Sequence, residues 1–354
     1  MMRMVRRSNP SKNMQILMRA GSVVAALAAA ALLMAALGYN PFLVYYNMVA
    51  GSFGTAYRLQ ATIHKVIPLL VLSLGIAVAF KMKFWNIGAE GQMAMGGFGA
   101  AYAALKYGAL PPYILLPLMF VLGMICGGIW GVIPAILKVK LGTNETLVTL
   151  MLNYIALRWL TYLQYGPWKV GGFPRIPDFS PNAVLPSLFG IHIGWMVAVL
   201  LTAAVYVMLR RTKLGYEIAV LGESESTARY AGINVSKVTI VAMLISGAVC
   251  GLAGMMQTSA VEKTLTEQFT GGLGFTAVIT TWLARLSPIG MIGTSFAFAM
   301  LIQGGGYLET TMSISSKMAD VLQGVIIFFV LGCDFFIQYK IQLRKPVRKG
   351  GEAK

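Results

Sequence analysis

The sequence predicts an all-α polytopic membrane protein with about ten transmembrane helices. Three observations support this fold class: 57% of the 354 residues are hydrophobic, the mean hydropathy is +0.70, and only 12% of residues are charged. Soluble domains carry about 25% charged residues. Most Lys and Arg residues lie in short segments between apolar runs, as expected of a chain that crosses a bilayer repeatedly.

Ten apolar runs are candidates for membrane helices. The first, 20–38, follows a basic segment (1–19) and resembles a signal peptide only superficially, because no cleavage site is followed by a soluble domain. We expect this run to be retained and the linker 39–60 to lie at the membrane interface. The other runs are 61–80, 86–106, 112–137, 145–165, 194–209, 238–258, 273–286, 288–304 and 318–338, and 273–286 is short enough to be a half-helix.

The distribution of basic residues predicts the orientation. Ten spans with a cytosolic N-terminus place most of the 29 Lys and Arg residues in cytosolic segments, including 1–19, 210–237 and the tail 339–354. Removing one span would reverse the side of every later segment. Both termini are therefore expected in the cytosol, flanking a transmembrane domain at 20–338. This asymmetry accounts for the net charge of +17, so binding of nucleic acid is not expected.

Residues 210–237 form the longest polar interruption in the second half of the chain. Ser224 or Ser226 can cap a short helix of about two turns, and Gly232 is a natural C-terminal stop. An ordinary solvated loop is the alternative interpretation. Against the loop, the segment carries an apolar set that needs a surface on which to dock: Tyr230, Ala231 and Ile233.

Polar residues also interrupt the apolar run at 84–104. Asn86, Glu90 and Gln92 stand among several glycines. A carboxylate that faces lipid costs about 2.5–3.5 kcal/mol at the bilayer centre, so we expect Glu90 to face protein or water. The glycines permit close helix contacts or a broken helix. Two interpretations stay open, namely a polar site in the membrane or hydrogen bonds that merely tie two helices together.

The run that begins near residue 142 has a capping signal and an isolated amide. Thr143 or Asn144 can cap the helix that Glu145 begins, where the positive end of the helix dipole favours a carboxylate. Asn153 lies two turns further on among apolar residues. It is a candidate either for a hydrogen bond between helices or for contact with a solute.

The sequence has no motif for catalysis or nucleotide hydrolysis: P-loop, GxSxG and HExxH patterns are absent. The three cysteines and two histidines do not form the pattern of a disulfide framework or a metal site. We therefore expect no catalytic residue, no metal and no cofactor bound by this chain. A polytopic protein with a cytosolic docking helix is then most simply a translocation pathway that a partner drives.

Five motifs occur in order between about Thr55 and Phe336. They are FWNIGAEGQMAMGGF, GTNETLVTLMLNYIAL, ARYAGI, ISGAVCGLAGMM (245–256) and GGLGFTAV (271–278). Together they resemble the permease subunits of bacterial ABC importers of the branched-chain amino acid and simple sugar class. NIGAEGQ with NETLVTLMLNYIA is most similar to the nucleoside, guanosine-type permeases of that class. The stretch ITTWLARLSPIG, which follows GFTAV, departs from the usual family pattern.

The resemblance implies a transport subunit of the bacterial cytoplasmic membrane, without enzyme activity of its own. Its implied partners are an ATPase with two fused nucleotide-binding modules, which uses the ATP, a second homologous permease and an extracytoplasmic substrate-binding lipoprotein. Segment 210–237 would couple the permease to the ATPase through Glu223, Ser224, Glu225, Ala228, Arg229, Tyr230, Gly232 and Ile233. The substrate pathway would include Asn86, Glu90, Gln92, Asn153, Tyr154 and Trp282.

Two alternatives to nucleoside import remain. The same architecture serves permeases for sugars or branched-chain amino acids. A secondary transporter driven by protons or sodium would instead use Glu90 or Glu145 as its titrating group. Both carboxylates lie near predicted cytosolic ends of spans, whereas a coupling carboxylate is expected near mid-span, and this position favours the partner-driven importer.

Overall fold

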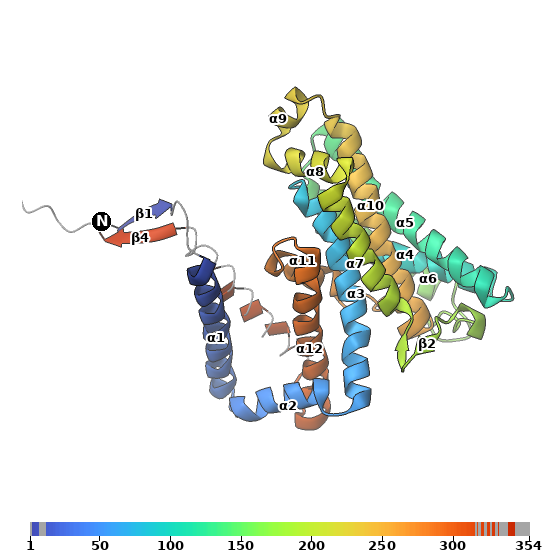
Figure 1. The fold of residues 1–354 in the computed structure, drawn as a ribbon. Helices are drawn as coiled ribbons and strands as arrows, with labels where there is room; N and C mark the ends of the chain where they lie inside the picture. Colours follow the sequence, from blue (N-terminus) through green and yellow to red (C-terminus); the bar gives the residue numbers. More distant parts are fainter. Residues whose placement is uncertain are drawn as a thin grey trace, which may run out of the picture. The chain divides into compact units, whose positions relative to one another are not determined.

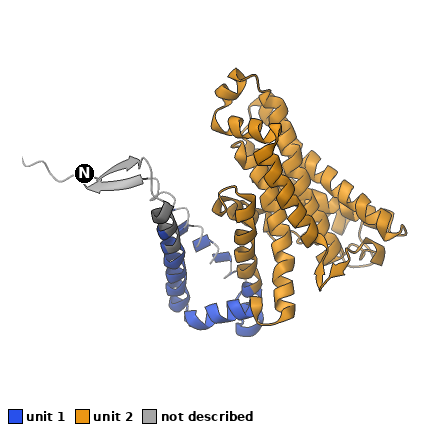
Figure 2. Cartoon of the chain, in the orientation of Figure 1, with its two compact units in different colours: residues 1–51, 304–354 blue, residues 52–303 orange. Residues whose placement is uncertain are grey.

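The computed structural model describes residues 2–6, 12–315 and 339–343, and isolated positions between 317 and 332. The chain divides into two compact units, one of residues 1–51 with 304–354 and one of residues 52–303 (Figure 2). The larger unit contains every residue that the sequence singled out for coupling or for the substrate pathway.

The smaller unit contains the two ends of the chain. Helices α1 (Lys12–Ala36) and α2 (Pro41–Phe53) are bent by 115° relative to each other, and the side chain of Asn40 accepts the N–H of Phe42 at the start of α2. The linker expected at 39–60 is therefore largely helical. Strands β1 (Met2–Arg6) and β4 (Tyr339–Leu343) pair antiparallel, which brings the two ends of the described chain together.

Helices make up most of the larger unit (Figure 1). The last of them, α12, continues past residue 303, where this unit ends. Between η1 and α7 lies a hairpin of two-residue strands, β2 and β3. The elements in chain order are α3 (Ala56–Lys81), α4 (Ala89–Lys106), α5 (Pro112–Leu141), α6 (Glu145–Tyr165), η1 (Pro181–Ala183), β2 (Ser187–Leu188), β3 (Ile191–His192), α7 (Gly194–Arg211), α8 (Lys213–Glu223), α9 (Glu225–Tyr230), α10 (Val235–Met256), the π-helix η2 (Gln257–Glu262), α11 (Leu273–Leu283) and α12 (Pro288–Met312).

The core of the larger unit is centred on α10, which packs against α3, α4 and α5. Glycines bring these helices close together. A Cβ atom added at Gly96 of α4 would collide with the backbone of Gly251 in α10, and one added at Gly251 would collide with the carbonyl of Gly123 in α5. Small residues at helix contacts are the usual means of close packing inside a membrane.

The expected count of ten membrane spans is not confirmed. Within the described ranges, six helices are long and apolar enough to cross a membrane, and α1 with α2 makes a seventh if the bent pair is one span. The expected span 86–106 forms α4, but its glycines and polar residues make it too weakly hydrophobic to count among these six helices. Helix α11 is a short apolar helix, as expected for 273–286. Most of the expected span 318–338 lies outside the described residues.

The all-α prediction is correct for the body of the fold and wrong at two small places. Strands β1 and β4 form one antiparallel pair, and β2 and β3 form the other. The strands β2 and β3 flank a two-residue turn, in which Gly190 has a φ of +78°, a conformation that glycine adopts without strain. Both strand pairs are too short to change the fold class.

Candidate functional site

The polar segment 210–237 folds into two helices at one end of the larger unit (Figure 1). The sequence predicted the second: α9 is capped by Ser224, whose hydroxyl accepts the N–H of Thr227 at 3.3 Å, and it stops before Gly232, where φ is +74°. Helix α8 was not predicted; it contains two glycines, which lower helix propensity and are common in turns. The signal for α8 was the helical spacing of three apolar side chains that pack on the core, Leu214, Ile218 and Leu221.

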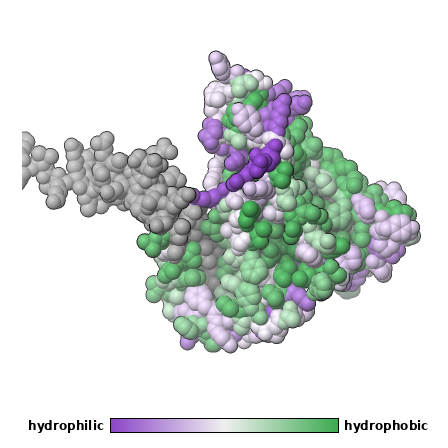
Figure 3. All heavy atoms as spheres, in the orientation of Figure 1, coloured by the Kyte–Doolittle hydropathy of each residue, from purple (hydrophilic) through white to green (hydrophobic). Residues whose placement is uncertain are grey.

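The apolar residues around α9 differ in exposure. Ala228 is fully buried and Ile233 is partly buried against the core, so these two hold α9 in place. Tyr230 is 97% exposed and presents its ring to the surroundings. Within α9, the guanidinium of Arg229 donates to the carboxylate of Glu225 at 2.8 Å. In the space-filling view, hydrophilic residues gather over the α8–α9 end, while apolar residues cover much of the remaining face (Figure 3).

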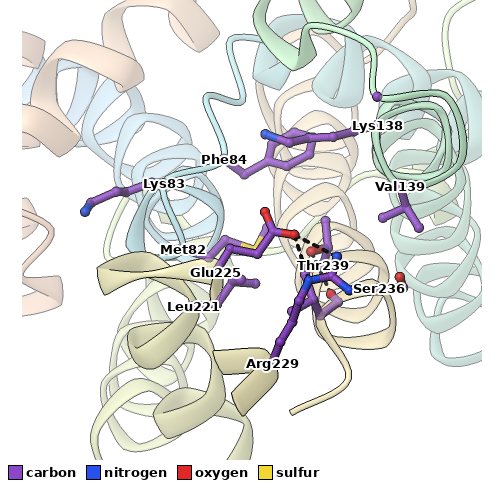
Figure 4. A pocket seen from close by; sticks show the side chains of 12 residues that line it. Met82, Lys83, Phe84, Lys138, Val139, Leu221, Glu225, Arg229, Ser236 and Thr239 are labelled. Atoms are coloured by element: carbon purple, nitrogen blue, oxygen red, sulfur yellow. Dashed lines mark hydrogen bonds and ion pairs between the residues drawn. The ribbon is translucent and has the colours of Figure 1, made fainter. Parts of the chain in front are cut away.

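A pocket of about 470 Å³ lies beneath α9 (Figure 4). Its walls come from the end of α3, the end of α5, both helices of the polar segment and the start of α10. Lys138 of α5 pairs with Glu145 at 2.8 Å and lies over the ring of Phe84, 5.2 Å from its centroid. Glu225 and Arg229 face the same pocket, so α9 is separated by open space from the end of α5.

Four of the six predicted pathway residues form one buried polar cluster. Asn86 and Gln92 form a reciprocal amide pair, in which each side chain donates to the other at 3.2 Å. Asn86 also donates to the hydroxyl of Ser246 in α10 at 3.2 Å. Asn86, Glu90, Gln92 and Asn153 are all at most 2% exposed.

Glu90 binds the start of the short helix α11. Its two carboxylate oxygens accept the backbone N–H groups of Gly272 at 3.0 Å and Gly274 at 2.6 Å, and the side chain of Thr270 also bonds to it. These N–H groups belong to the unpaired first turn of a helix, where the dipole favours a negative charge. Glu90 therefore joins α4 to the loop and helix that follow η2.

Asn153 joins α6 to the beginning of α4. Its amide nitrogen donates to the carbonyl of Ile87 at 2.9 Å, and its amide oxygen accepts the N–H of Gly91 at 2.8 Å. Asn144, one of the two expected caps, begins α6 by accepting the N–H groups of Thr146 and Leu147. In this conformation both polar atoms of the Asn153 amide have protein partners.

Tyr154 and Trp282 do not join this cluster. Tyr154 is 58% exposed and lies on an open face of α6 with Arg158 and Tyr162. Trp282 is 42% exposed and stacks on Trp85, with ring centroids 5.2 Å apart. Trp85 and Ser246 are not among the residues that the sequence predicts for the pathway. Trp85 directly precedes Asn86, whereas no local signal distinguishes Ser246 from other small residues of α10.

Comparison with known proteins identifies the family. A family model described as the permease component of the branched-chain amino acid transport system matches residues 58–331. The chain is 30% identical to the glucose ABC transporter permease protein TsgB13 of Haloferax volcanii, over 94% of this chain and 91% of that protein. It is 28% identical to the nucleoside ABC transporter permease protein NupB of Lactococcus lactis, over 96% of each.

A third relative is the guanosine ABC transporter permease protein NupP of Bacillus subtilis, which is 30% identical over 87% of this chain and 91% of that protein. The matched region includes the whole α8–α9 segment and every member of the buried polar cluster. The resemblance found from the sequence motifs is thereby confirmed. The chain belongs to the branched-chain amino acid transport system permease family, and it is a multi-pass membrane transport subunit.

Proposed function

We propose that the chain translocates nucleosides as a permease subunit of an ATP-driven importer in the bacterial cytoplasmic membrane. The observation that carries the proposal is the full-length similarity to NupB, together with that to NupP. A sugar is the second candidate solute, because the glucose permease TsgB13 is equally similar. Nucleosides and sugars share a ring with several hydroxyl groups. A branched-chain amino acid, to which the family description refers, is the third candidate.

The proposed complex has three other components. An ATPase with two fused nucleotide-binding modules uses the ATP, a second homologous permease completes the pathway, and an extracytoplasmic lipoprotein delivers the solute. This permease would bind no cofactor itself. Membership of a transport-system permease family supports these partners. We further propose that both termini are cytosolic and flank a transmembrane domain at 20–338, and the pairing of β1 with β4 supports an even number of crossings.

Helices α8 and α9 are the proposed contact with the ATPase. Tyr230 provides an exposed aromatic ring, while the pocket beneath α9 leaves room for this helix to move. At Gly222, the backbone of α8 lies so close to the carbonyl of Lys81, the last residue of α3, that a Cβ atom would not fit. Movement of α8 would therefore reach α3, and the ATPase would bias the permease between two states through its different affinity for each.

In the proposed pathway, the buried polar cluster is a structural element that changes between states. Asn86, Glu90, Gln92 and Asn153 bind one another or the backbone in this conformation, so solute contact by these groups would require a state in which their bonds open. Tyr154 and Trp282 keep exposed aromatic rings that are available to a flat base or to a neighbouring protein.

Uptake by the reconstituted complex tests the proposed function. The permease, its ATPase and its binding protein are placed in liposomes with ATP on the ATPase side, and labelled guanosine, cytidine, glucose and leucine are supplied on the other. Nucleoside uptake that requires ATP is expected. If the complex takes up glucose or leucine but no nucleoside, the proposed solute is wrong. If the permease without its partners takes up solute under a proton or sodium gradient, the proposed ATP-driven mechanism is wrong.

Tyr230→Asp tests the coupling surface. Because Tyr230 is 97% exposed, the substitution should change the stability of the permease by less than about 0.5 kcal/mol, while a charge in the interface should release the ATPase. Co-purification of the ATPase is the measurement. Tyr113→Asp is a matched control, because Tyr113 is also exposed (77%) but lies at the start of α5, outside the segment. If the Tyr230→Asp permease co-purifies with as much ATPase as the wild type does, α9 is not part of the interface.

A further inference from the structure

A second pocket lies at the opposite end of the larger unit from α8 and α9. Helix α3 connects the two ends: Tyr57 in its first turn lines this pocket, and Lys81 at its last residue contacts α8 (Figure 1). We call it the η2 pocket. Its volume is about 560 Å³, and its polar and aromatic lining includes Tyr57, Gln60, Lys65, Gln257, Gln268 and Gln303. Pockets of roughly 300–1,000 Å³ are typical of sites for small molecules.

Several polar groups of the η2 pocket lack a protein partner. Over the ranges that the structure describes, the ammonium of Lys65 and the side-chain amides of Gln268 and Gln303 make no hydrogen bond or ion pair. Lys65 is half-buried, and removing an ammonium from water without a partner is unfavourable. The amide nitrogen of Gln60 donates to the carbonyl of Phe189 at 3.2 Å, and its amide oxygen has no partner within the described ranges. The pocket thus offers donors and acceptors to an external molecule.

One wall of the η2 pocket has an unusual backbone conformation, and hydrogen bonds to other segments hold it in place. Helix η2 is a π-helix, a form often found at functional sites, and Lys263 directly after it has a φ of +55°. The carbonyl of Lys263 accepts the N–H of Phe179 at 2.8 Å. Further along the wall, Thr270 bonds to Glu90 of the buried polar cluster. The cluster therefore supports the loop on which Gln268 lies.

We propose that the η2 pocket is the entry site at which the permease receives a nucleoside from the binding protein. This inference rests on the proposed function, in which α8 and α9 face the cytosol and the η2 pocket faces outward. A nucleoside combines a flat base, carbonyl or ring-nitrogen acceptors and ribose hydroxyls. Tyr57 offers a ring to the base, Lys65 donates to a base carbonyl, and Gln268 and Gln303 both donate to and accept from hydroxyls.

The uptake rate at saturating solute tests the role of Lys65. Loss of a hydrogen bond from a charged donor predicts that Lys65→Gln lowers guanosine uptake by about tenfold or more, whereas Lys65→Arg retains a larger part of the rate. The ratio of guanosine to cytidine rates should also change, because the two bases place their carbonyls differently. Lys106→Gln is the control, because Lys106 lies outside the pocket and bonds to Tyr102 at 3.0 Å.

Photolabelling gives an independent measurement. With 8-azidoguanosine as the probe, the reconstituted wild-type complex should be labelled on peptides that contain residues 57–65 or 257–271. Labelling confined to α6 around Asn153, or to the binding protein, would contradict the assignment. Competition by unlabelled guanosine should remove the label from the pocket peptides.

The outcomes separate this inference from the proposed function. If the wild-type complex imports glucose and no nucleoside, the proposed function is wrong, and so is the assignment of a nucleoside to the η2 pocket. If the wild type imports nucleosides while folded Lys65→Gln and Gln268→Ala complexes keep both the rate and the guanosine to cytidine ratio, only the entry site is wrong. Loss of binding-protein association in these variants would also overturn it, because the pocket would then be a docking surface.

Discussion

The buried polar cluster and the η2 pocket are both polar regions of an apolar protein, and they differ in how their polar groups are satisfied. In the cluster, the amides of Asn86, Gln92 and Asn153 and the carboxylate of Glu90 all have protein partners. In the pocket, several groups have none among the residues described. A polar residue in an apolar run therefore does not by itself indicate contact with a solute, and its hydrogen bonds must be traced first.

The largest effect is expected from Glu90→Ala. The substitution leaves the buried N–H group of Gly274 and the half-buried N–H group of Gly272 without their acceptor, which should destabilise the protein by roughly 3–5 kcal/mol. Thermal unfolding of the purified protein in detergent measures this loss. Glu90→Gln keeps one carbonyl acceptor and should lose less. If Glu90→Ala unfolds at the wild-type temperature, the hydrogen bonds to α11 are not structural and the cluster no longer contrasts with the pocket.

Asn153→Ala should have the next largest effect. It removes one hydrogen bond to the carbonyl of Ile87 and one from the N–H of Gly91, and the expected loss of stability is about 2–3 kcal/mol. The same protein preparation serves for the thermal measurement and for uptake. An Asn153→Ala protein that is as stable as the wild type but slower in uptake would instead support Asn153 as a solute contact.

Local signals in the sequence were sufficient for much of the helical framework. The sequence offers Asn144 and Ser224 each as one of two possible caps, Gly232 as a stop and 273–286 as a short span. The structure contains these two caps, this stop and a short helix at Leu273–Leu283. Helix α8 was missed because glycine is both a turn signal and, at Gly222, the residue that lets two backbones approach. The sequence alone does not distinguish these two uses.

The candidate site was less predictable because hydrogen-bond partners come from distant parts of the chain. Asn153 was a reasonable candidate by position, but its partners Ile87 and Gly91 lie on another helix, and only the fold shows that its amide is occupied. The η2 pocket was not found because Tyr57, Gln268 and Gln303 come from three separate segments, each unremarkable by itself. Satisfied and unsatisfied polar groups look alike in a sequence.

His192 is a third case, a buried polar ring without a partner. It is 3% exposed and stacks on His64 with ring centroids 5.0 Å apart, and neither ring nitrogen has a hydrogen-bond partner in the part of the chain that the structure describes. Burial, and to a lesser degree the neighbouring His64, lower the pKa of His192 from 6.5 to about 4. The unfolded chain therefore binds the proton more tightly, and stability should decrease as the pH falls from 6.5 towards 4.

At pH 5 the expected loss attributable to His192 is about 2 kcal/mol relative to pH 8. Unfolding temperatures at the two pH values measure it, in the wild type and in His192→Leu, which has no titrating group at this position. The difference between the two pH values should be smaller in the variant. An equal difference in both proteins would show that other groups account for the acid sensitivity.

The smallest effect on stability is expected from Gln268→Ala. Like Asn153→Ala, this substitution removes a side-chain amide. The Gln268 side chain, however, is exposed and has no hydrogen-bond partner among the described residues. The unfolding free energy should change by less than about 0.5 kcal/mol, because no protein donor or acceptor is left unpaired. The two variants, unfolded under identical conditions, form a matched pair. A loss with Gln268→Ala as large as that with Asn153→Ala would mean that the Gln268 amide is engaged by the protein, and the pocket would then lose one of the groups that make it receptive to a solute.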